Sequence, residues 1–391
     1  MKRKNKPITF GAPDVGYDEI NAVKKVILSK WIGTGPIARQ FEKKFKSYKK
    51  ANYALSVNSC TSAIHISLLT LGIDHGDEVL VTSMTFSSTI NAIIHSGAKP
   101  ILIDIKPETF NIDSELLEKK ISKKTKGILA VHLAGLPCDM SEILKIKKKY
   151  KLNLIEDCAH AVESKYKGKH AGTFGDAGCF SFYSTKNLTT GEGGMILFKK
   201  KELFEKAKII SLHGLSKDAW KRSKKSKVVS KNFHYDVKEI GFKYNLTDIN
   251  ASIGLVQLEK LEKNHKKRQI LFNEYQKNLI KMPIFIQSFN KNIVRHGCHL
   301  FILALDKSKT KKNRDSLFTY LSSNKIGCGI NYRSVTDMSV FKKKFGWNNK
   351  TCVNSKYLGD NTISLPLHPN MTKSQVKYIC KLVKNFFSEN F

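Results

Sequence analysis

The sequence predicts an α/β fold in which a largely parallel sheet is followed by a smaller α+β domain. From about residue 53 to residue 155, short apolar runs typical of strands alternate with segments of helical periodicity. This alternation is typical of a parallel sheet that helices cover on both faces. The last third of the chain mixes strand and helix patterns less regularly. We therefore expect a large domain over residues 1–255 and a small C-terminal domain over residues 256–391.

The composition supports a folded protein with more than one domain. The chain has 391 residues, of which 41% are hydrophobic, enough for a sizeable core. It contains no run of about eighteen apolar residues, so we expect no membrane span. The basic N-terminus is not followed by an apolar stretch, which argues against a secretory signal. Eight cysteines lie singly along the chain, so we expect reduced thiols, no metal site and a cytoplasmic location.

The net charge of +35 is compatible with nucleic-acid binding, with an anionic substrate, or with a lysine-rich solvated surface. The excess is mostly lysine, spread in short runs from end to end, and no nucleic-acid recognition module is recognisable. We therefore favour a basic surface, which would also attract a phosphorylated substrate. We expect no nucleic-acid partner.

The chain begins with two predicted helices. Ile20, Val23 and Ile27 recur at helical spacing and predict an amphipathic helix that starts near residue 16. A glycine-containing segment at residues 31–36 ends it. A second helix over 37–49, a strand over 53–57 and an apolar helix that ends near residue 71 follow.

Strands and helices then alternate as far as residue 198. Thr247 caps a strong helix that continues to about residue 280, and the basic stretch 213–240 before it is predicted to be a long loop. The other predicted strands are 78–81, 100–104, 127–131, 152–155, 179–184 and 195–198, with helices at 87–96, 113–121 and 139–150. In the small domain we expect a strand at 299–305 and helices at 313–324 and 373–388.

Five side chains capable of chemistry or stacking lie at or just beyond predicted strand ends. Ligands of open α/β sheets bind at the carboxyl ends of the strands. A shared position of this kind suggests a common site. The five residues are Phe86, His132, Asp157, His160 and Lys186.

Lys186 follows a strand with buried aromatic residues and precedes a glycine-rich turn. Burial would lower the pKa of its amine and make it nucleophilic. The alternative is a strand-end lysine that merely extends its amine to water. Asp157 directly follows another buried strand, where a carboxylate is costly unless a cation or hydrogen bonds accompany it.

These residues match the requirements of pyridoxal phosphate. That cofactor needs a lysine for an imine, a carboxylate at the ring nitrogen, a phosphate cup and an apolar plate over the ring. The turn at residues 59–61 would form the cup at a helix N-terminus, although an ordinary helix cap is the alternative explanation for this turn. The other candidates are Lys186, Asp157, Ser181 for the phosphate, Phe86 for the plate and His160 for the ring hydroxyl.

Long motifs in this order resemble those of the DegT/DnrJ/EryC/StrS sugar aminotransferases. The resemblance extends over nearly the whole chain. It rests on residues 156–161, 175–194 and 241–258, with further matches at 31–36, 132–135, 213–222 and 364–369.

The resemblance implies a fold-type I pyridoxal phosphate enzyme, similar to aspartate aminotransferase, with a mostly parallel seven-stranded sheet in its large domain. It also implies a homodimer with active sites shared between the subunits. Because the chain has Lys186 where related dehydratases have histidine, it implies transamination. The roles carried over are Lys186 as cofactor anchor and proton carrier, Asp157 at the pyridinium, Phe86 on the ring, His160 at the ring oxygen, and Cys60, Thr61 and Ser181 at the phosphate.

The chain departs from the family pattern at a few positions. Lys243 and Asn245 stand where many members have asparagine and arginine, as in a branch similar to the enzymes that form UDP-4-amino-4-deoxy-L-arabinose. Asn245 is then the candidate for the neighbouring subunit's phosphate. Tyr183 replaces a frequent histidine and is expected to face the sugar. Lys221, Arg222 and Arg333 are candidates for the substrate diphosphate, with an ordinary surface role as the alternative.

The expected function is amino transfer from L-glutamate to a keto sugar nucleotide, with a 4-keto UDP- or dTDP-sugar as substrate, for amino-sugar or polysaccharide biosynthesis. One alternative is a 3-keto sugar nucleotide. Two others come from different classes, a regulator that binds pyridoxal phosphate and a scaffold homologue without turnover.

Overall fold

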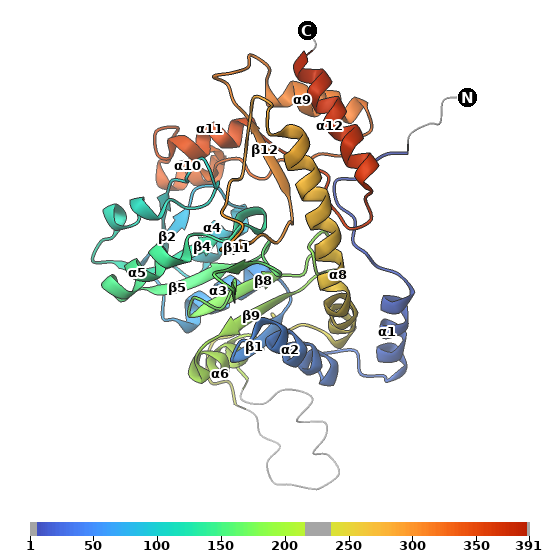
Figure 1. The fold of residues 1–391 in the computed structure, drawn as a ribbon. Helices are drawn as coiled ribbons and strands as arrows, with labels where there is room; N and C mark the ends of the chain where they lie inside the picture. Colours follow the sequence, from blue (N-terminus) through green and yellow to red (C-terminus); the bar gives the residue numbers. More distant parts are fainter. Residues whose placement is uncertain (1–5, 216–235, 389–391) are drawn as a thin grey trace.

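The computed structural model describes residues 6–215 and 236–388 (Figure 1). Its large sheet has the order β1-β9-β8-β5-β4-β2-β3. Strand β9 is antiparallel to both of its neighbours, and the strands from β8 to β3 pair in parallel. The predicted largely parallel sheet is therefore confirmed. Its strands are β1 (Tyr53–Val57), β2 (Glu78–Thr82), β3 (Lys99–Ile103), β4 (Thr125–Val131), β5 (Asn153–Asp157), β8 (Ala177–Ser181) and β9 (Gly194–Phe198).

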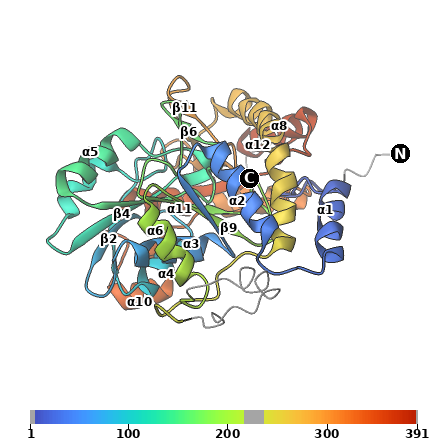
Figure 2. The same cartoon turned by 90° about the horizontal axis from the view of Figure 1, so that it is seen from below.

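Helices cover both faces of this sheet, as the alternating pattern predicts. One face packs on α3 (Cys60–Thr70), α4 (Ser87–His95) and α6 (Lys201–Ile210), with Ile64, Ile93 and Ile210 in its core. The opposite face packs on α2 (Pro36–Lys49), α5 (Met140–Tyr150) and α8 (Asp248–Leu279). Figure 2 shows these two groups of helices on opposite sides of the strands.

The C-terminal part builds a second core on a three-stranded antiparallel sheet of β10 (Ile284–Ile286), β12 (Phe301–Leu305) and β13 (Thr362–Leu365). Helices α9 (Arg314–Ser323) and α12 (Lys373–Ser388) pack on it. Two further helices, α10 (Ser339–Phe345) and α11 (Val353–Asn361), lie between α9 and β13 in the chain. A small sheet of β6 (Lys165–Tyr166), β7 (Lys169–His170) and β11 (Val294–Arg295) completes the described strands.

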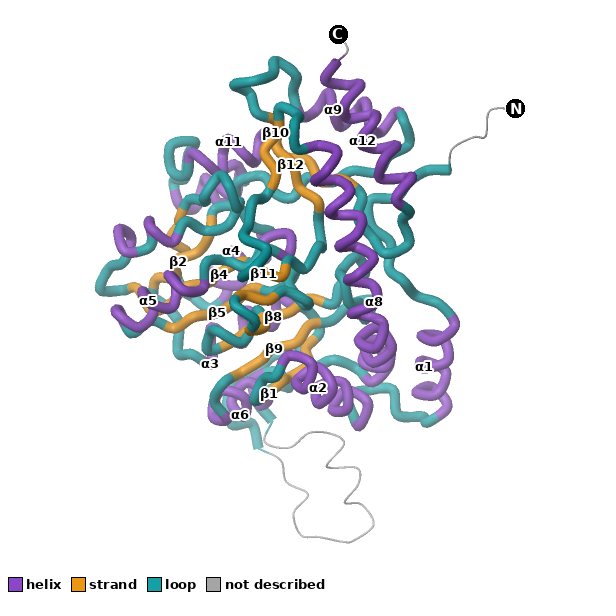
Figure 3. The backbone as a smooth tube through the Cα atoms, in the orientation of Figure 1, coloured by secondary structure: helices purple, strands orange, loops and turns teal. Residues whose placement is uncertain are grey.

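Helix α8 belongs to both cores. Its N-terminal half contributes Ala251 and Leu261 to the core with α2, and its C-terminal half contributes Leu271 and Tyr275 to the core around β12. In Figure 3 this helix runs beside both sheets. The expected domain division at residue 255 falls inside this continuous 32-residue helix, and the division stays a prediction.

Two predicted elements differ from the structure. Residues 113–121 form two 3₁₀ turns, η1 (Ser114–Leu116) and η2 (Glu118–Lys120), and the Asp113 carboxylate caps the first by accepting from the N–H of Glu115 at 3.0 Å. The strand predicted over 179–184 ends at Ser181. The chain turns there, and the backbone N–H of Lys186 donates to the carbonyl of Tyr183 at 2.9 Å. Lys186 therefore lies in a turn beyond the strand.

Helix α1 (Tyr17–Leu28) forms where the periodicity predicts it, but its apolar stripe points away from the rest of the chain. Ile20 is 60% exposed and Ile27 is 55% exposed, whereas Glu19 and Val26 face inward. Among residues 6–215 and 236–388, no helix combines the length and apolar character needed to cross a membrane.

Candidate active site

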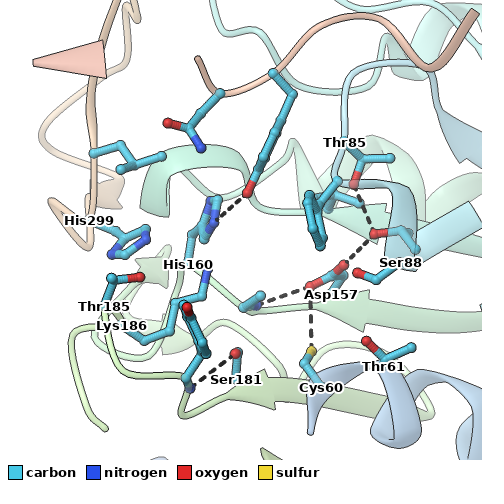
Figure 4. Close-up of a pocket in the computed structure, with 18 of the residues that line it drawn as sticks. Cys60, Thr61, Thr85, Ser88, Asp157, His160, Ser181, Thr185, Lys186 and His299 are labelled. Carbon is cyan, nitrogen blue, oxygen red and sulfur yellow. Dashed lines mark hydrogen bonds between the residues drawn. The ribbon is translucent and has the colours of Figure 1, made fainter. Parts of the chain in front are cut away.

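A cavity of about 480 Å³ lies beyond the carboxyl ends of the parallel strands (Figure 4). Side chains at or just after the ends of β1, β2, β4, β5 and β8 meet in it, together with residues of the N-terminal segment and of the C-terminal part. Of the candidates named from the sequence, it brings together Cys60, Thr61, Phe86, His132, Asp157, His160, Ser181, Tyr183 and Lys186.

Asp157 ends strand β5 and is buried at the base of the cavity. The hydroxyl of Thr89 donates to its Oδ2 at 2.9 Å, and the backbone N–H of Ala159 donates to its Oδ1 at 3.0 Å. Burial raises the pKa of this carboxyl group, and these hydrogen bonds and the nearby Lys186 oppose that rise. A cation opposite Asp157 would therefore be strongly favoured.

Lys186 lies in the turn after β8 and lines the same cavity. Burial lowers the pKa of its amine to about 8, and the neighbouring Cys60 and Asp157 act in the opposite direction. A substantial fraction of the amine is consequently unprotonated and nucleophilic near neutral pH. Lys186 lines the cavity and its amine is removed from bulk water, so it is not a strand-end lysine that extends its amine to the solvent.

The N-terminus of α3 forms one wall of the cavity. The Ser59 hydroxyl accepts from the N–H of Ser62 at 3.1 Å, so Ser59 is an ordinary helix cap. Cys60 and Thr61, in the first turn, line the cavity beside Ser181. A helix N-terminus offers free N–H groups and the positive end of the helix dipole, which suit a phosphate.

A glycine at the start of β9 permits this arrangement. A Cβ atom at Gly194 would lie 2.6 Å from the carbonyl oxygen of Ser59, so only glycine lets the strand approach the helix start so closely. The start of α3 is thereby held close to the sheet that carries Asp157.

Pyridoxal phosphate fits this set of residues. The buried Asp157 carboxylate meets the need for an anion at the ring nitrogen, and the Lys186 amine has the low pKa that imine formation requires. Phe86 is 55% exposed, and because its ring lines the cavity, a face remains available for stacking. Tyr332 adds a second aromatic ring, with its centroid 5.7 Å from that of Phe86.

His160 presents a hydrogen-bond donor to the cavity region. The backbone N–H of Ala134 donates to its Nδ1 at 3.1 Å, so the proton of the neutral ring sits on Nε2, 3.2 Å from the Tyr332 hydroxyl. Burial and the charge of Lys186 hold the pKa of His160 well below its usual value. The ring is therefore neutral and suited to donate to a ring oxygen.

His132 and Glu156 form a buried pair beside the site. His132 Nε2 lies 3.0 Å from Glu156 Oε2, and that carboxylate also accepts from the N–H groups of Gly172, Phe174 and Gly175. The ligand atoms of His132, Glu156 and Cys158 lie within 4.8 Å of one another, close enough for a metal ion. The hydrogen bonds that Glu156 accepts instead make it an anchor for the turn at residues 172–175.

Four candidates from the sequence are absent from the cavity lining: two lie elsewhere in the chain, and two cannot be placed. Asn245 donates from Nδ2 to the Thr34 hydroxyl at 2.5 Å, in the glycine-containing segment before α2. The Arg333 side chain is 58% exposed and lies 3.9 Å from Asp337. Lys221 and Arg222 fall outside the described residues.

The cavity also contains residues that the sequence reasoning missed. Thr89 lies three positions after Phe86, on the first turn of α4, and this helical spacing was a usable signal. Asn331, Tyr332 and His299 come from the C-terminal part, and only the tertiary packing places them here.

Comparison with known proteins agrees with this geometry. The profile of the DegT/DnrJ/EryC1/StrS aminotransferase family matches residues 13–384. An uncharacterized protein of Methanocaldococcus jannaschii, MJ1066, is 42% identical over 378 residues, which cover 97% of each chain. The spore coat polysaccharide biosynthesis protein SpsC of Bacillus subtilis is 37% identical over 386 residues, which cover 98% of each chain.

The fold is similar to that of Spr1654 from Streptococcus pneumoniae, which is described as a sugar aminotransferase. With its pyridoxal phosphate form the TM-score is 0.89 at 29% identity, over 98% of this chain and 99% of that one. Its pyridoxamine phosphate form gives the same TM-score. The family expected from the motifs is thus confirmed: this chain belongs to the DegT/DnrJ/EryC1/StrS aminotransferase family and is a pyridoxal-phosphate-dependent sugar aminotransferase of fold type I.

Proposed function

We propose that this enzyme transfers the amino group of L-glutamate to the keto group of a nucleotide-linked sugar. The preferred substrate is a 4-keto UDP- or dTDP-sugar. The observation that carries the proposal is the pairing of a buried carboxylate, Asp157, with a low-pKa amine, Lys186, in one cavity. The similarity to SpsC, named for spore coat polysaccharide biosynthesis, supports a product for polysaccharide assembly.

Seven residues of the cavity have a proposed task. Bound pyridoxal phosphate supplies the electron sink for breaking bonds at the amino-bearing carbon. Asp157 would keep the ring nitrogen protonated, and Phe86 would cover the ring. Lys186 would anchor the cofactor between turnovers and carry the proton during them. Cys60, Thr61 and Ser181 would hold the phosphate, and His160 would donate from Nε2 to the ring oxygen.

The substrate side of the cavity is proposed from position and charge. Tyr183 lines the cavity and is exposed, so it can face the sugar ring. Lys221, Arg222 and Arg333 remain candidates for the diphosphate. The net charge of +35 would attract any dianionic nucleotide sugar to the protein surface.

We further propose a homodimer with shared active sites. Helix α1 exposes an apolar face made of Tyr17, Ile20, Ile27 and Leu28, and a second copy would cover it. Asn245 lies outside its own cavity and stays the candidate for the partner's phosphate. A cytoplasmic location, where nucleotide sugars are made available, fits the eight free cysteines.

Absorbance spectroscopy tests the proposed donor and acceptor. The purified protein should be yellow, lose that absorbance with L-glutamate, and regain it with the correct keto sugar nucleotide. A panel of 4-keto and 3-keto UDP- and dTDP-sugars then selects the acceptor. Lys186→Ala is the control and should give no spectral cycle.

Two outcomes would contradict the proposal. One is a cycle driven by other amino acids but not by glutamate, and the other is recovery with free keto sugars alone. Tight, salt-sensitive binding to duplex DNA without turnover would instead favour the regulatory alternative.

A further inference from the structure

Two buried histidines share one wall of the cavity. The rings of His160 and His299 lie with their centroids 4.4 Å apart, at an interplanar angle of 37°. His160 follows β5 of the large sheet, whereas His299 precedes β12 of the small one. In Figure 4 both rings lie beside Lys186. Their hydrogen bonds determine which ring nitrogen of each carries the proton.

The amide of Asn187 fixes the proton of His299. Asn187 Nδ2 donates to Glu163 Oε2 at 3.0 Å and to the carbonyl of Gly297 at 2.9 Å. The reverse amide orientation would place an oxygen against that carboxylate and that carbonyl, which is unfavourable. Asn187 Oδ1 must therefore face His299 Nδ1, 3.0 Å away, and Nδ1 must carry the proton.

The orientation of Asn187 is itself held by a buried ion pair. The other carboxylate oxygen of Glu163 accepts from the guanidinium of Arg268, on α8, and both side chains are buried. Breaking such a pair is strongly unfavourable, so the Glu163 carboxylate keeps its orientation. Asn187 directly follows Lys186 in the chain, so the same anchor fixes the turn that carries the lysine.

The Nε2 atoms of the two rings consequently differ in their hydrogen-bonding character. His160 carries its proton on Nε2, as its bond from Ala134 requires, and His299 leaves Nε2 bare. Burial and the charge of Lys186 lower the pKa of both histidines well below the usual value, so both are neutral. One ring is a donor and its neighbour is an acceptor.

We propose that His299 is a positioning residue for Lys186. Its bare Nε2 is the acceptor for the lysine amine after substrate has displaced that amine from the cofactor, because the His299 ring and Lys186 line the same cavity. The bond directs the lone pair of the amine into the cavity, where it takes and returns the substrate proton. Asn187 and the Glu163–Arg268 pair keep His299 in the required tautomer. This inference rests on the aminotransferase chemistry and on no particular sugar.

Nuclear magnetic resonance of the full chain tests the tautomers without any substrate. With ¹⁵N-labelled histidine, a protonated and a bare ring nitrogen have well separated shifts, and the variants His160→Asn and His299→Asn assign the signals. We expect the proton of His299 on Nδ1 and that of His160 on Nε2. Asn187→Ala should release His299 into a mixture of tautomers. A proton on His299 Nε2 in the wild type would overturn the proposal.

A matched pair of substitutions tests the role. His299→Gln keeps an acceptor near the position of Nε2 but loses the bond to Asn187, whereas His299→Asn keeps that bond and loses the acceptor. Loss of a hydrogen bond to a group that becomes charged corresponds to about tenfold or more. We therefore expect His299→Asn to slow kcat of the amino-donor half-reaction about tenfold more than His299→Gln, with KM little changed.

A purely structural histidine would give the opposite order, because then only the bond to Asn187 would matter. Equal losses in the two variants would also overturn the proposal. Thermal unfolding of both proteins accompanies the kinetics. If glutamate is not the donor, the spectral cycle of the wild type fails but the tautomer of His299 is unchanged. Failure of the proposed function is therefore distinguishable from failure of the proposed role of His299.

Discussion

At the scale of single residues, burial acts on Asp157 and Lys186 in opposite directions. It raises the pKa of the carboxyl group and lowers that of the amine, so each is held nearer to its neutral form than in water. The hydrogen bonds from Thr89 and Ala159 partly offset the rise in the pKa of Asp157 and so favour its charged form. A protonated ring nitrogen beside Asp157 would stabilise its charged form further, which is why this site suits a pyridine cofactor.

Asp157→Asn tests the charge separately from the shape. The amide fills the same space and can still accept from Ala159, but it cannot hold a proton on the ring nitrogen. Loss of one preorganised charge costs about a hundredfold or more in rate. We expect a loss of that size in the glutamate half-reaction, measured by stopped-flow absorbance. Thr89→Ser, which keeps the hydroxyl, should stay near wild type, and a rate within threefold for Asp157→Asn would contradict the assignment.

The lowered pKa of Lys186 also predicts a pH dependence of stability without cofactor. The folded protein releases this proton at a pH of about 8, whereas the unfolded chain holds it up to about 10.5. Between these values the unfolded state binds more protons, so the contribution of Lys186 to the unfolding free energy rises with pH. Below pH 8 the folded state carries the full free-energy cost of burying the charged Lys186 amine.

We therefore expect Lys186→Met to be more stable than wild type below pH 8, with the difference narrowing as pH rises towards 10. Urea unfolding at a series of pH values measures it. The exposed Lys343→Met is the matched control and should show no such narrowing. A constant difference between wild type and Lys186→Met across the range would exclude this linkage.

At the scale of elements, the start of α8 is joined to the start of α2 through Asp248. Its buried carboxylate accepts from the N–H groups of Gly35, Ile37 and Ala38, at 2.7, 3.2 and 2.9 Å. A carboxylate at this position satisfies the free N–H groups of a helix start and complements its dipole.

We expect Asp248→Ala to lower the unfolding free energy by about 2 kcal/mol, at the upper end for a lost helix cap because the site is buried. Urea unfolding measures the change. Asp248→Asn keeps one acceptor oxygen and should lose less. Equal losses in the two variants would show that the charge, and not the cap, dominates.

Local patterns predicted most of the elements, because a strand or helix with one buried face carries its own periodicity. They failed where the outcome depends on partners distant in sequence. The apolar stripe of α1, with Ile20 and Ile27, predicts a buried face but not what buries it. The periodicity of segment 113–121 predicts a helix but does not distinguish an α-helix from the two 3₁₀ turns that form there.

The same distinction holds for the site. Strand ends identify Asp157 and Lys186 because parallel strands bring their carboxyl ends to one edge. His299 and Tyr332 carry no local signature, since the C-terminal part reaches the cavity only after α8 and β12 have packed. The tautomer of His299 is harder still to predict from the sequence, because it depends on successive hydrogen bonds through Asn187 and Glu163.

At the scale of the whole molecule, the exposed face of α1 predicts the assembly state. Tyr17, Ile20 and Leu28 lie on one side of this helix and are 82%, 60% and 69% exposed. An apolar face of this kind on a helix that is otherwise well packed marks an interaction surface. If a second copy covers it, glutamate in place of Ile20 would bring a carboxylate against the apolar side chains of the partner and oppose association.

We expect wild type to sediment as a dimer and Ile20→Glu to sediment largely as a monomer. Activity should fall in parallel if the subunits of the proposed dimer share their active sites. Sedimentation velocity measures the oligomeric state, and the rate of the glutamate half-reaction measures the activity. Ile280→Glu is the matched control, since Ile280 is 74% exposed at the far end of α8. A dimeric Ile20→Glu protein would place the interface elsewhere, and a fully active monomer would show that each cavity works without its neighbour.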